Sequence, residues 1–145
     1  MVDPERVRRL LTLLERYRGH LAALRDLDRD VYVDEQAFAG RYLVQAAAQT
    51  CIDVANHVIA SERWRVPMDY RDTFTVLEEH DVLTPELATR LRALAGLRNR
   101  LVHLYEDIDD RLVHELLQER LPDLKAFATV IAGVVAAAEG DGDGW

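Results

Sequence analysis

A short segment of this chain, from Arg98 to Tyr105, gathers four side chains that can carry out acid–base and phosphate chemistry. Arg98 supplies a permanent cation, Asn99 an amide, His103 an imidazole and Tyr105 a phenol. An imidazole titrates near neutrality, so His103 can take a proton from a ribose 2′-hydroxyl or give one to a leaving 5′-oxygen. A guanidinium stays charged and matches the geometry of a phosphate, so Arg98 can stabilise the charge that develops on it. These residue types suffice for phosphodiester chemistry without a metal ion.

The spacing of these residues limits how they can cooperate. Asn99 and His103 share one face of a helix, where Asn99 can orient the imidazole. Arg98 and His103 point about 140° apart around the helix axis, so one helix cannot easily aim both at one atom. Two copies of the helix packed across a two-fold axis could do so, which favours a composite site in a homodimer. The pattern alone leaves open that these residues only form structural ion pairs and satisfied polar groups.

A second polar pattern lies in an otherwise apolar helix predicted to end near Ser61. Its side chains recur every three or four residues: Gln45, Gln49, Asp53, Asn56 and His57. One interpretation is the exposed stripe of an amphipathic helix. The other is a set of partners that receives Arg98 or His103, because buried polar groups need hydrogen bonds. On this second interpretation Asp53 is a supporting residue of the site.

Helical periodicity and capping residues predict the elements that position these side chains. Asp3 caps a first helix with Pro4 at its first position, and Thr84 and Pro85 begin the motif helix in the same way. Asp109 or Asp110 caps the next helix, and Pro122 breaks or kinks the chain. The other predicted boundaries are a first helix to about 29, a connection over 30–34, a second helix to about 61, a loop over 62–70, a short helix over about 71–80 and a last helix ending near 139.

Helices of these lengths joined by short loops predict an all-α fold, an up-and-down bundle of four to six helices. The bundle is expected to form a single domain over residues 1–139, followed by a flexible tail over 140–145. In the motif helix a stripe of leucines is predicted to face the core: Leu87, Leu91, Leu94, Leu97, Leu101 and Leu104. Trp64 is expected to plug the end of the bundle.

Composition sets limits on the class of protein. The single cysteine, Cys51, lies in an apolar run and is expected to be a buried, inert thiol in a reducing compartment. No apolar run reaches the roughly 18 residues that span a bilayer, and the N-terminus lacks the apolar core of a signal peptide, so the expected location is the cytoplasm. The five histidines show no paired ligand spacing, so no metal or other cofactor is predicted.

The distribution of charge is uneven. The formal net charge of −8 argues against nucleic-acid binding by bulk attraction. However, the stretch from Leu87 to Tyr105 contains no acidic residue and four arginines, which we call the basic strip: Arg90, Arg92, Arg98 and Arg100. The strip is either an ordinary solvated helix face or part of a surface that binds an anion.

The segment Arg98-Asn99-Arg100-Leu101-Val102-His103-Leu104-Tyr105 resembles the Arg-x4-His-x-Tyr signature of HepT toxins, a branch of the HEPN superfamily. The residues around Cys51 to Ile59, the Arg65-Val66-Pro67 segment and the stretch that follows the motif are also similar to that family, so the resemblance covers about residues 5–130. The chain departs from it at Leu104, where a glycine is common. A bulkier side chain there narrows a cleft but removes no reacting group.

The resemblance implies a metal-independent endoribonuclease that acts as a homodimer on transfer or messenger RNA, with Arg98 and His103 catalytic and Asn99 supporting them. It also implies a partner, a minimal nucleotidyltransferase antitoxin that transfers AMP to Tyr105, and a higher assembly with that antitoxin. The Tyr105 phenol, two residues after the histidine, is well placed for this transfer. Bulk and negative charge at Tyr105 would block RNA binding. Two alternatives stay open: a non-catalytic helical module that binds a nucleotidyltransferase or a nucleotide, and a purely structural bundle.

Overall fold

Capping residues determine where the long helices begin. The Asp3 carboxylate accepts a hydrogen bond from the backbone N–H of Arg6 at 3.2 Å, and the Thr84 hydroxyl accepts one from Leu87 at 3.2 Å. Asp109 accepts two from the first turn of the last helix, at 3.0 and 3.4 Å. Each cap satisfies backbone donors that have no partner inside the helix. The sequence predicted all three of these starts.

The computed structural model describes residues 1–143, and side chains up to residue 140. Its elements, in chain order, are α1 (Pro4–Arg25), α2 (Arg29–Val31), a π-helical turn η1 (Tyr32–Gln36), α3 (Ala37–Ser61), α4 (Tyr70–Glu79), α5 (Pro85–His103), a 3-10 turn η2 (Tyr105–Asp107) and α6 (Asp110–Asp143). The described part of the chain contains no strand, and the predicted all-α class is confirmed.

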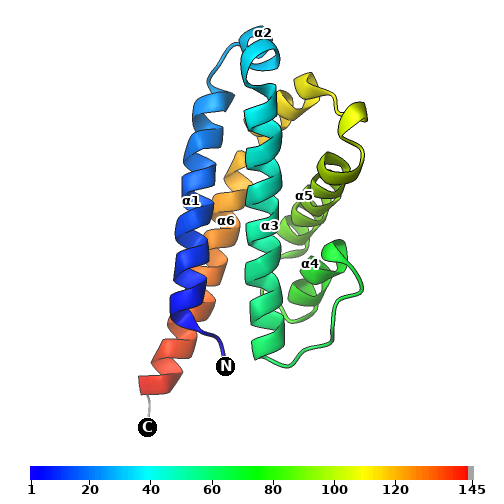
Figure 1. The fold of residues 1–145 in the computed structure, drawn as a ribbon. Helices are drawn as coiled ribbons and strands as arrows, with labels where there is room; N and C mark the ends of the chain where they lie inside the picture. The colour runs from blue at the N-terminus through cyan, green and yellow to red at the C-terminus, as the bar shows by residue number, and fades with distance from the viewer. Residues whose placement is uncertain (144–145) are drawn as a thin grey trace.

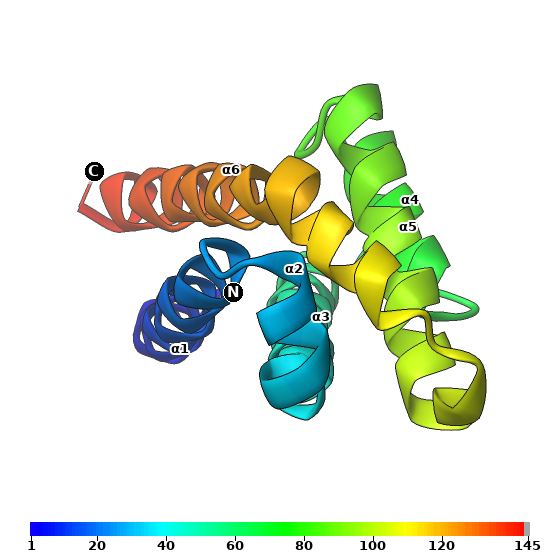
Figure 2. The same cartoon turned by 90° about the horizontal axis from the view of Figure 1, so that it is seen from above.

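The four long helices α1, α3, α5 and α6 alternate in direction, as Figure 1 shows, so the predicted up-and-down bundle is confirmed. Helix α3 is central because it packs against α1, α4, α5 and α6. In the view from above, α1 and α6 lie on one side of the bundle and α4 and α5 on the other (Figure 2). The C-terminal end of α5 therefore lies at the same end of the bundle as η1 and the start of α3 (Figure 1).

The core is formed by apolar side chains from all of the long helices. Phe74 of α4 meets Phe127 of α6 edge to face, with ring centroids 6.1 Å apart. Cys51 is fully buried on α3, as predicted, and burial raises the pKa of its thiol. Trp64 stacks on His80 with ring centroids 3.9 Å apart and covers the end of the bundle between α3 and α4.

Three predicted boundaries are wrong. Helix α1 ends at Arg25 rather than near residue 29, and the connection that was expected over 30–34 is itself helical, with Asp28 as its cap. Pro122 does not divide the last helix but lies inside α6. Pro122 is on the exposed side of α6, where water can satisfy the carbonyl that loses its partner, while the buried neighbours Leu121 and Leu124 keep the helix on the core.

Helix α6 also continues beyond its predicted end near Glu139 and is helical through Asp143. An ion pair between Arg8 of α1 and Glu139 links this end of α6 to the bundle. The tail predicted over 140–145 therefore begins as a continuation of α6, and residues 144–145 lie outside the described residues.

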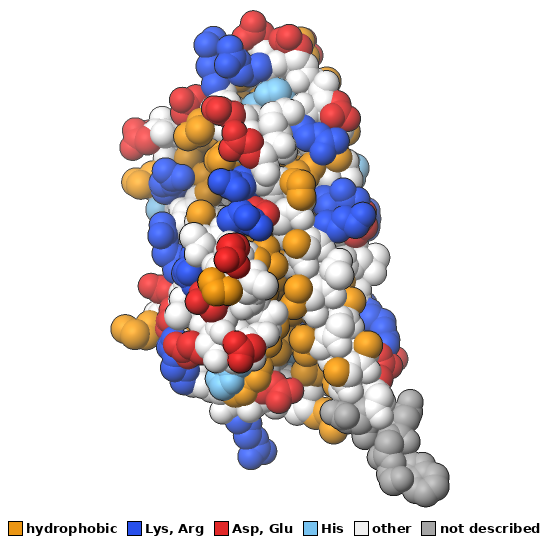
Figure 3. All heavy atoms as spheres, turned by 180° about the vertical axis from the view of Figure 1, so that it is seen from behind, with side chains coloured by type: hydrophobic (Ala, Val, Ile, Leu, Met, Phe, Trp, Pro, Cys, Tyr) orange, Lys and Arg blue, Asp and Glu red, His pale blue; other side chains and the backbone are white. Residues whose placement is uncertain are grey.

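By length and composition alone, α6 could cross a membrane, since a stretch over 110–140 reaches a mean hydropathy of 1.6. In this fold, however, two of its large apolar side chains pack in the core of the bundle. Phe127 and Ile131 are fully buried against the other helices, and α6 packs on α1, α3 and α5. Figure 3 shows that charged side chains of both signs are mixed with hydrophobic ones over the rear face of the molecule.

Candidate functional site

Arg98 is half-buried on α5 and its charge is available to a ligand. Its guanidinium carbon lies 4.9 Å from the ring centre of Tyr70, the first residue of α4, and its Nη1 donates to Asn99 Oδ1 at 3.2 Å. Among the described residues, Arg98 Nε is buried without a hydrogen-bond partner. No carboxylate within that part of the chain lies within 4.0 Å of this guanidinium. A cation that is partly desolvated and unpaired attracts an anion more strongly than one in bulk water does.

Arg98 shares a cleft with the polar side chains of α3. The cleft has a volume of about 290 Å³ and lies between α1, α3 and α5; it is lined by Leu13, Tyr17, Tyr42, Gln45, Ala46, Gln49, Thr50, Asp53 and Arg98. Gln49 Nε2 donates to Asp53 Oδ1 at 2.9 Å, while Gln49 Oε1 is buried with no partner among the described residues. The structure thus brings Asp53 and Arg98 to one cleft, where Arg98 Nε and Gln49 Oε1 are both buried without a hydrogen-bond partner among the described residues.

The polar pattern of α3 does not act as one set. Gln45, Gln49 and Asp53 line the cleft, but Asn56 accepts a hydrogen bond from Thr73 of α4 at 3.3 Å. His57 lies farther along α3 and accepts the backbone N–H of Asp3 at 3.0 Å. Burial, and then the charge of Arg6, lower the pKa of His57. The last two residues of the pattern therefore hold neighbouring elements in place.

His103 and Tyr105 lie at the exposed end of α5, outside the cleft of Arg98. His103 is the last residue of α5, and Tyr105 begins η2 with 61% of its surface exposed. Asn99 was expected to hold the imidazole, but its oxygen is bound by the neighbouring Arg98 instead. In one protomer the guanidinium and the imidazole therefore lie in different settings, which agrees with the angle between them on the helix. That two protomers combine them remains a prediction.

The basic strip divides into two halves. Arg90 pairs with Asp123 at 2.9 Å and Arg92 with Glu78 at 2.8 Å. Arg98 and Arg100 make no ion pair with any side chain that the structure describes. The half of the strip near the N-terminus of α5 is thus neutralised, and the half that carries the motif keeps its charge.

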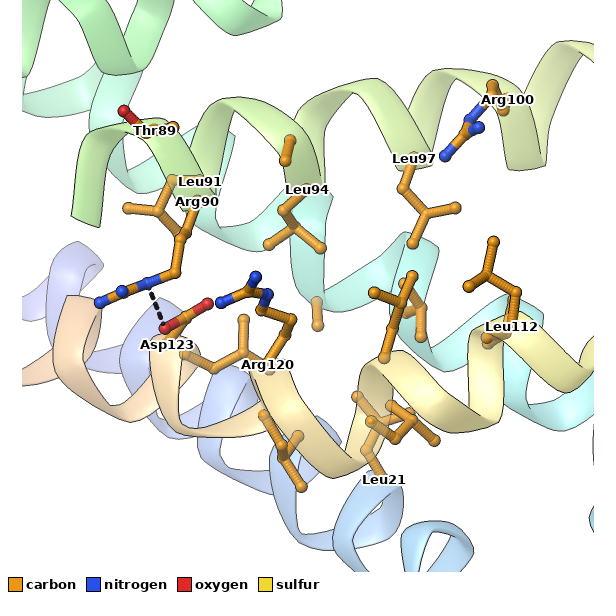
Figure 4. Close-up of a pocket in the computed structure, with 18 residues that line it drawn as sticks. Leu21, Thr89, Arg90, Leu91, Leu94, Leu97, Arg100, Leu112, Arg120 and Asp123 are labelled. Atoms are coloured by element: carbon orange, nitrogen blue, oxygen red, sulfur yellow. Dashed lines mark ion pairs between the residues drawn. The ribbon is translucent and has the colours of Figure 1, made fainter. Parts of the chain in front are cut away.

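A larger groove of about 380 Å³ runs between α5 and α6, away from the motif side chains (Figure 4). Apolar side chains form most of its walls, and Arg90 and Arg100 lie toward its opposite ends. Leu94 and Leu97 line this groove and are only partly buried, and Leu104 is 53% exposed. Leu94 and Leu97 still pack against the core, so the prediction that the leucine stripe faces the core is wrong only for Leu104, which caps the exposed end of α5.

Two residues near the motif were given no role in the site from the sequence. Tyr70 was assigned to a loop, yet its ring covers the Arg98 guanidinium. Arg41 of α3 donates to both carboxylate oxygens of Asp110 at 2.7 Å and to the backbone carbonyl of Tyr105 at 3.1 Å. Tyr105 and Asp110 are 64 and 69 residues away from Arg41 in the sequence, so no local pattern could indicate these contacts.

Among the described residues, no group of three or more His, Cys, Asp and Glu side chains could hold a metal ion. The site that the structure offers is thus a half-buried guanidinium in a polar cleft and an exposed imidazole and phenol at the end of the same helix.

Comparison with known proteins places this geometry in context. The family model described as ribonuclease HepT-like matches residues 8–131. A tRNA nuclease HepT from Aphanizomenon flos-aquae is 29% identical over 144 residues, 98% of each chain. An mRNA nuclease HepT from Shewanella oneidensis is 34% identical over 88 residues, which cover 61% of this chain and 66% of that relative.

Solved structures share the fold. A tri-AMPylated HEPN toxin from Shewanella oneidensis, in complex with its MNT antitoxin, superposes with a TM-score of 0.81 and 25% identity over 92% of this chain and 99% of that one. A cytosolic protein of unknown function from Bacillus subtilis, YutE, superposes with a TM-score of 0.80 over 94% of this chain and 93% of that one. Its identity of 23% supports likeness of fold alone.

Proposed function

This chain belongs to the HepT-like ribonuclease family, and we propose that it is the toxin of a toxin–antitoxin system, an endoribonuclease that cleaves RNA without a metal ion. The observation that carries the proposal is the state of Arg98. It is half-buried in a polar cleft, no described carboxylate pairs with it, and its Nε has no partner. A structural arginine at that degree of burial would be expected to have an acidic partner.

In the proposed reaction His103 takes the proton of a ribose 2′-hydroxyl, and the 2′-oxygen attacks the adjacent phosphorus. The bond from phosphorus to the 5′-oxygen breaks, and the 5′-oxygen leaves with a proton given by an imidazolium. The products are a 2′,3′-cyclic phosphate and a 5′-hydroxyl. Arg98 stabilises the extra negative charge on the phosphoryl oxygens. Asn99 holds the guanidinium through its amide oxygen, and Asp53 fixes Gln49 beside it.

The reaction needs both Arg98 and His103 at one phosphate, so we propose a homodimer in which each protomer contributes to a shared groove. The exposure of His103 leaves it accessible to a second protomer and to RNA. The substrate is transfer or messenger RNA, the two classes that the related nucleases are named for. The location that suits this activity is the cytoplasm.

Control by a minimal nucleotidyltransferase antitoxin is the second part of the proposal. The solved structure of a similar toxin is tri-AMPylated and in complex with an MNT antitoxin. In this chain the Tyr105 phenol is 61% exposed next to His103, where a transferase can reach it. AMP on Tyr105 adds bulk and negative charge where the RNA phosphate must lie, so it prevents binding by sterics and repulsion.

The test is cleavage of total cellular RNA by the purified protein in excess chelator. The parent is expected to cleave, and Arg98→Ala and His103→Ala are expected to lose at least about a hundredfold in rate. His20→Ala and Arg16→Ala, which change exposed residues of α1, are matched controls and should cleave as the parent does. Equal rates for the parent and the two motif variants would overturn the assignment.

A non-catalytic module that binds a nucleotidyltransferase or a nucleotide is the second candidate, and the net charge of −8 favours it. Expression in a host that lacks the antitoxin separates the two. A ribonuclease arrests growth and His103→Ala relieves the arrest, whereas a binding module gives the same growth with and without the imidazole.

A further inference from the structure

Arg41, which lies outside the motif, ties the turn that carries Tyr105 to the body of the bundle. Its Nε and Nη2 donate to the two carboxylate oxygens of Asp110, each at 2.7 Å, and its Nη1 donates to the carbonyl oxygen of Tyr105 at 3.1 Å. One guanidinium thus joins α3, η2 and the start of α6. The Arg41 and Asp110 side chains are 21% and 17% exposed, so water competes little for these bonds.

The segment that precedes Arg41 is packed closely against the start of α3 and against α6, and the Arg41 guanidinium carbon lies 5.6 Å from the ring centre of Phe38. The π-helical turn η1 precedes α3, and its Tyr32 is fully buried beneath Gly40, where an added Cβ would collide with the Tyr32 hydroxyl. The Tyr32 ring lies 4.8 Å from the ring of His114 on α6. Burial, and then the charge of Asp110, raise the pKa of Tyr32 to about 12. Single π-helical turns occur often at functional sites.

Few other contacts hold the turn. Leu104 and Tyr105 are 53% and 61% exposed. Within the described residues, the remaining hydrogen bonds of this stretch are local: Leu104 N–H to the carbonyl of Arg100 at 2.8 Å, and Asp107 N–H to the carbonyl of Leu104 at 2.9 Å. The hydrogen bond from Arg41 is therefore the one that reaches 104–107 from another part of the bundle.

We propose that Arg41 is a positioning residue of the site: by holding the Tyr105 carbonyl and Asp110 together, it fixes the placement of the Tyr105 phenol and of His103, two residues earlier. The proposal rests on the proposed ribonuclease function. A lysine at position 41 keeps the charge but cannot hold three oxygens in a fixed plane, because it lacks the fork of a guanidinium. A displacement of about 1 Å at a catalytic group can cost up to about a hundredfold in rate.

The first experiment measures backbone amide hydrogen exchange in the intact protein. Arg41→Lys is expected to raise exchange in 104–110 about tenfold, an increase in local opening that costs the protein little of its global stability. Arg65→Lys is the matched control, because Arg65 makes the same kind of fork to Asp72 and Glu79 far from the turn. Unchanged exchange in Arg41→Lys would overturn the proposal.

The second experiment separates a positioning role from a merely structural one. With total cellular RNA as substrate, Arg41→Lys should lower kcat about tenfold with KM and melting temperature unchanged, while Arg65→Lys keeps the kcat of the parent. If the turn opens in Arg41→Lys but kcat does not fall, the contact is structural and the proposal is wrong.

Asp110→Asn tests the same contact from its other side, in case Arg41→Lys does not fold. It preserves the shape of the side chain, removes the charge from the pair, and should reproduce both effects. If the parent itself cleaves no RNA, the proposed function has failed, and the exchange comparison alone decides whether Arg41 holds the turn.

Discussion

Arg98 and His103 lie on one helix, yet the protein supports them in two different ways. Arg98 is half-buried in the middle of the bundle, under Tyr70 and beside the polar side chains of α3. His103 and Tyr105 lie at the exposed end of α5, where, among the described residues, one long-range hydrogen bond, from Arg41, reaches the turn. Burial strengthens the field of the guanidinium; under the proposed function, the exposure of the imidazole and the phenol would let them meet RNA, a second protomer and a transferase. One end of the motif is thus built for electrostatics and the other for access.

The largest effect expected from this difference is on Arg98 itself. Arg98→Lys should lower the rate of RNA cleavage about a hundredfold, because an ammonium cannot offer a planar fork to a phosphate from under Tyr70. Arg100→Lys, an exposed neighbour in the basic strip, is the control and should cleave nearly as fast as the parent. Steady-state cleavage assays measure both. If Arg98→Lys cleaves as fast as Arg100→Lys and the parent, the strip acts by its charge alone, because lysine preserves that charge.

A second substitution tests the packing of Tyr32 against Gly40, next to Arg41 and the turn. Gly40→Ala places a methyl group against the Tyr32 hydroxyl and should lower the free energy of unfolding by about 1–3 kcal/mol. Backbone amide hydrogen exchange should increase at Tyr105 more than in the residues that line the cleft of Arg98. Gly133→Ala, on the exposed side of α6 with open space around it, should instead stabilise the protein by about 0.5–1 kcal/mol. Urea unfolding measures both. If Gly40→Ala leaves the free energy of unfolding unchanged, the packing around Tyr32 is loose.

A smaller effect is expected at the cover of the cleft. Tyr70→Leu removes the ring that lies over the guanidinium and should lower cleavage by about fivefold, the equivalent of roughly 1 kcal/mol for a partly buried cation–π contact. Tyr17 lines the same cleft without covering Arg98, so Tyr17→Leu is the comparison. If both variants cleave alike, shielding by Tyr70 contributes nothing to the site.

The smallest effect concerns pH and should leave both regions of the motif unchanged. His57 accepts the Asp3 N–H as a neutral imidazole, and its pKa is lowered in the folded state. The folded protein therefore binds this proton less readily than the unfolded chain. The stability that His57 contributes is complete above about pH 6.5 and is lost as the pH falls through the lower folded value. Unfolding at pH ~7.5 and pH ~5 should show a smaller acid loss for His57→Gln than for the parent; an identical loss would contradict this assignment.

The sequence was sufficient for the starts of the helices and the class of the fold, because caps and periodicity are local signals. Asp3, Thr84 and Asp109 each satisfy backbone donors within three residues. The sequence failed where one local rule competes with tertiary packing, as at Pro122, which α6 accommodates on its exposed side.

The site was predictable in part for the same reason. Arg98, His103 and Tyr105 could be singled out by residue type and spacing, and Asp53 by its place in a polar pattern. The prediction that Asn99 contacts the His103 imidazole was wrong, because the amide oxygen of Asn99 accepts a hydrogen bond from the neighbouring Arg98 guanidinium. Arg41 could not be found, because its contacts cross 64 and 69 residues and exist only after α3 and α6 have packed.

The central claim is that two protomers share the guanidinium and the imidazole of one site, and subunit mixing tests it most directly. Arg98→Ala and His103→Ala, each inactive alone, are unfolded together, refolded at equal concentrations and assayed for RNA cleavage. If each site takes Arg98 from one protomer and His103 from the other, half of the dimers carry one intact site, and about a quarter of the parent activity returns. A refolded mixture that contains mixed dimers but cleaves no faster than either variant alone would contradict the shared site.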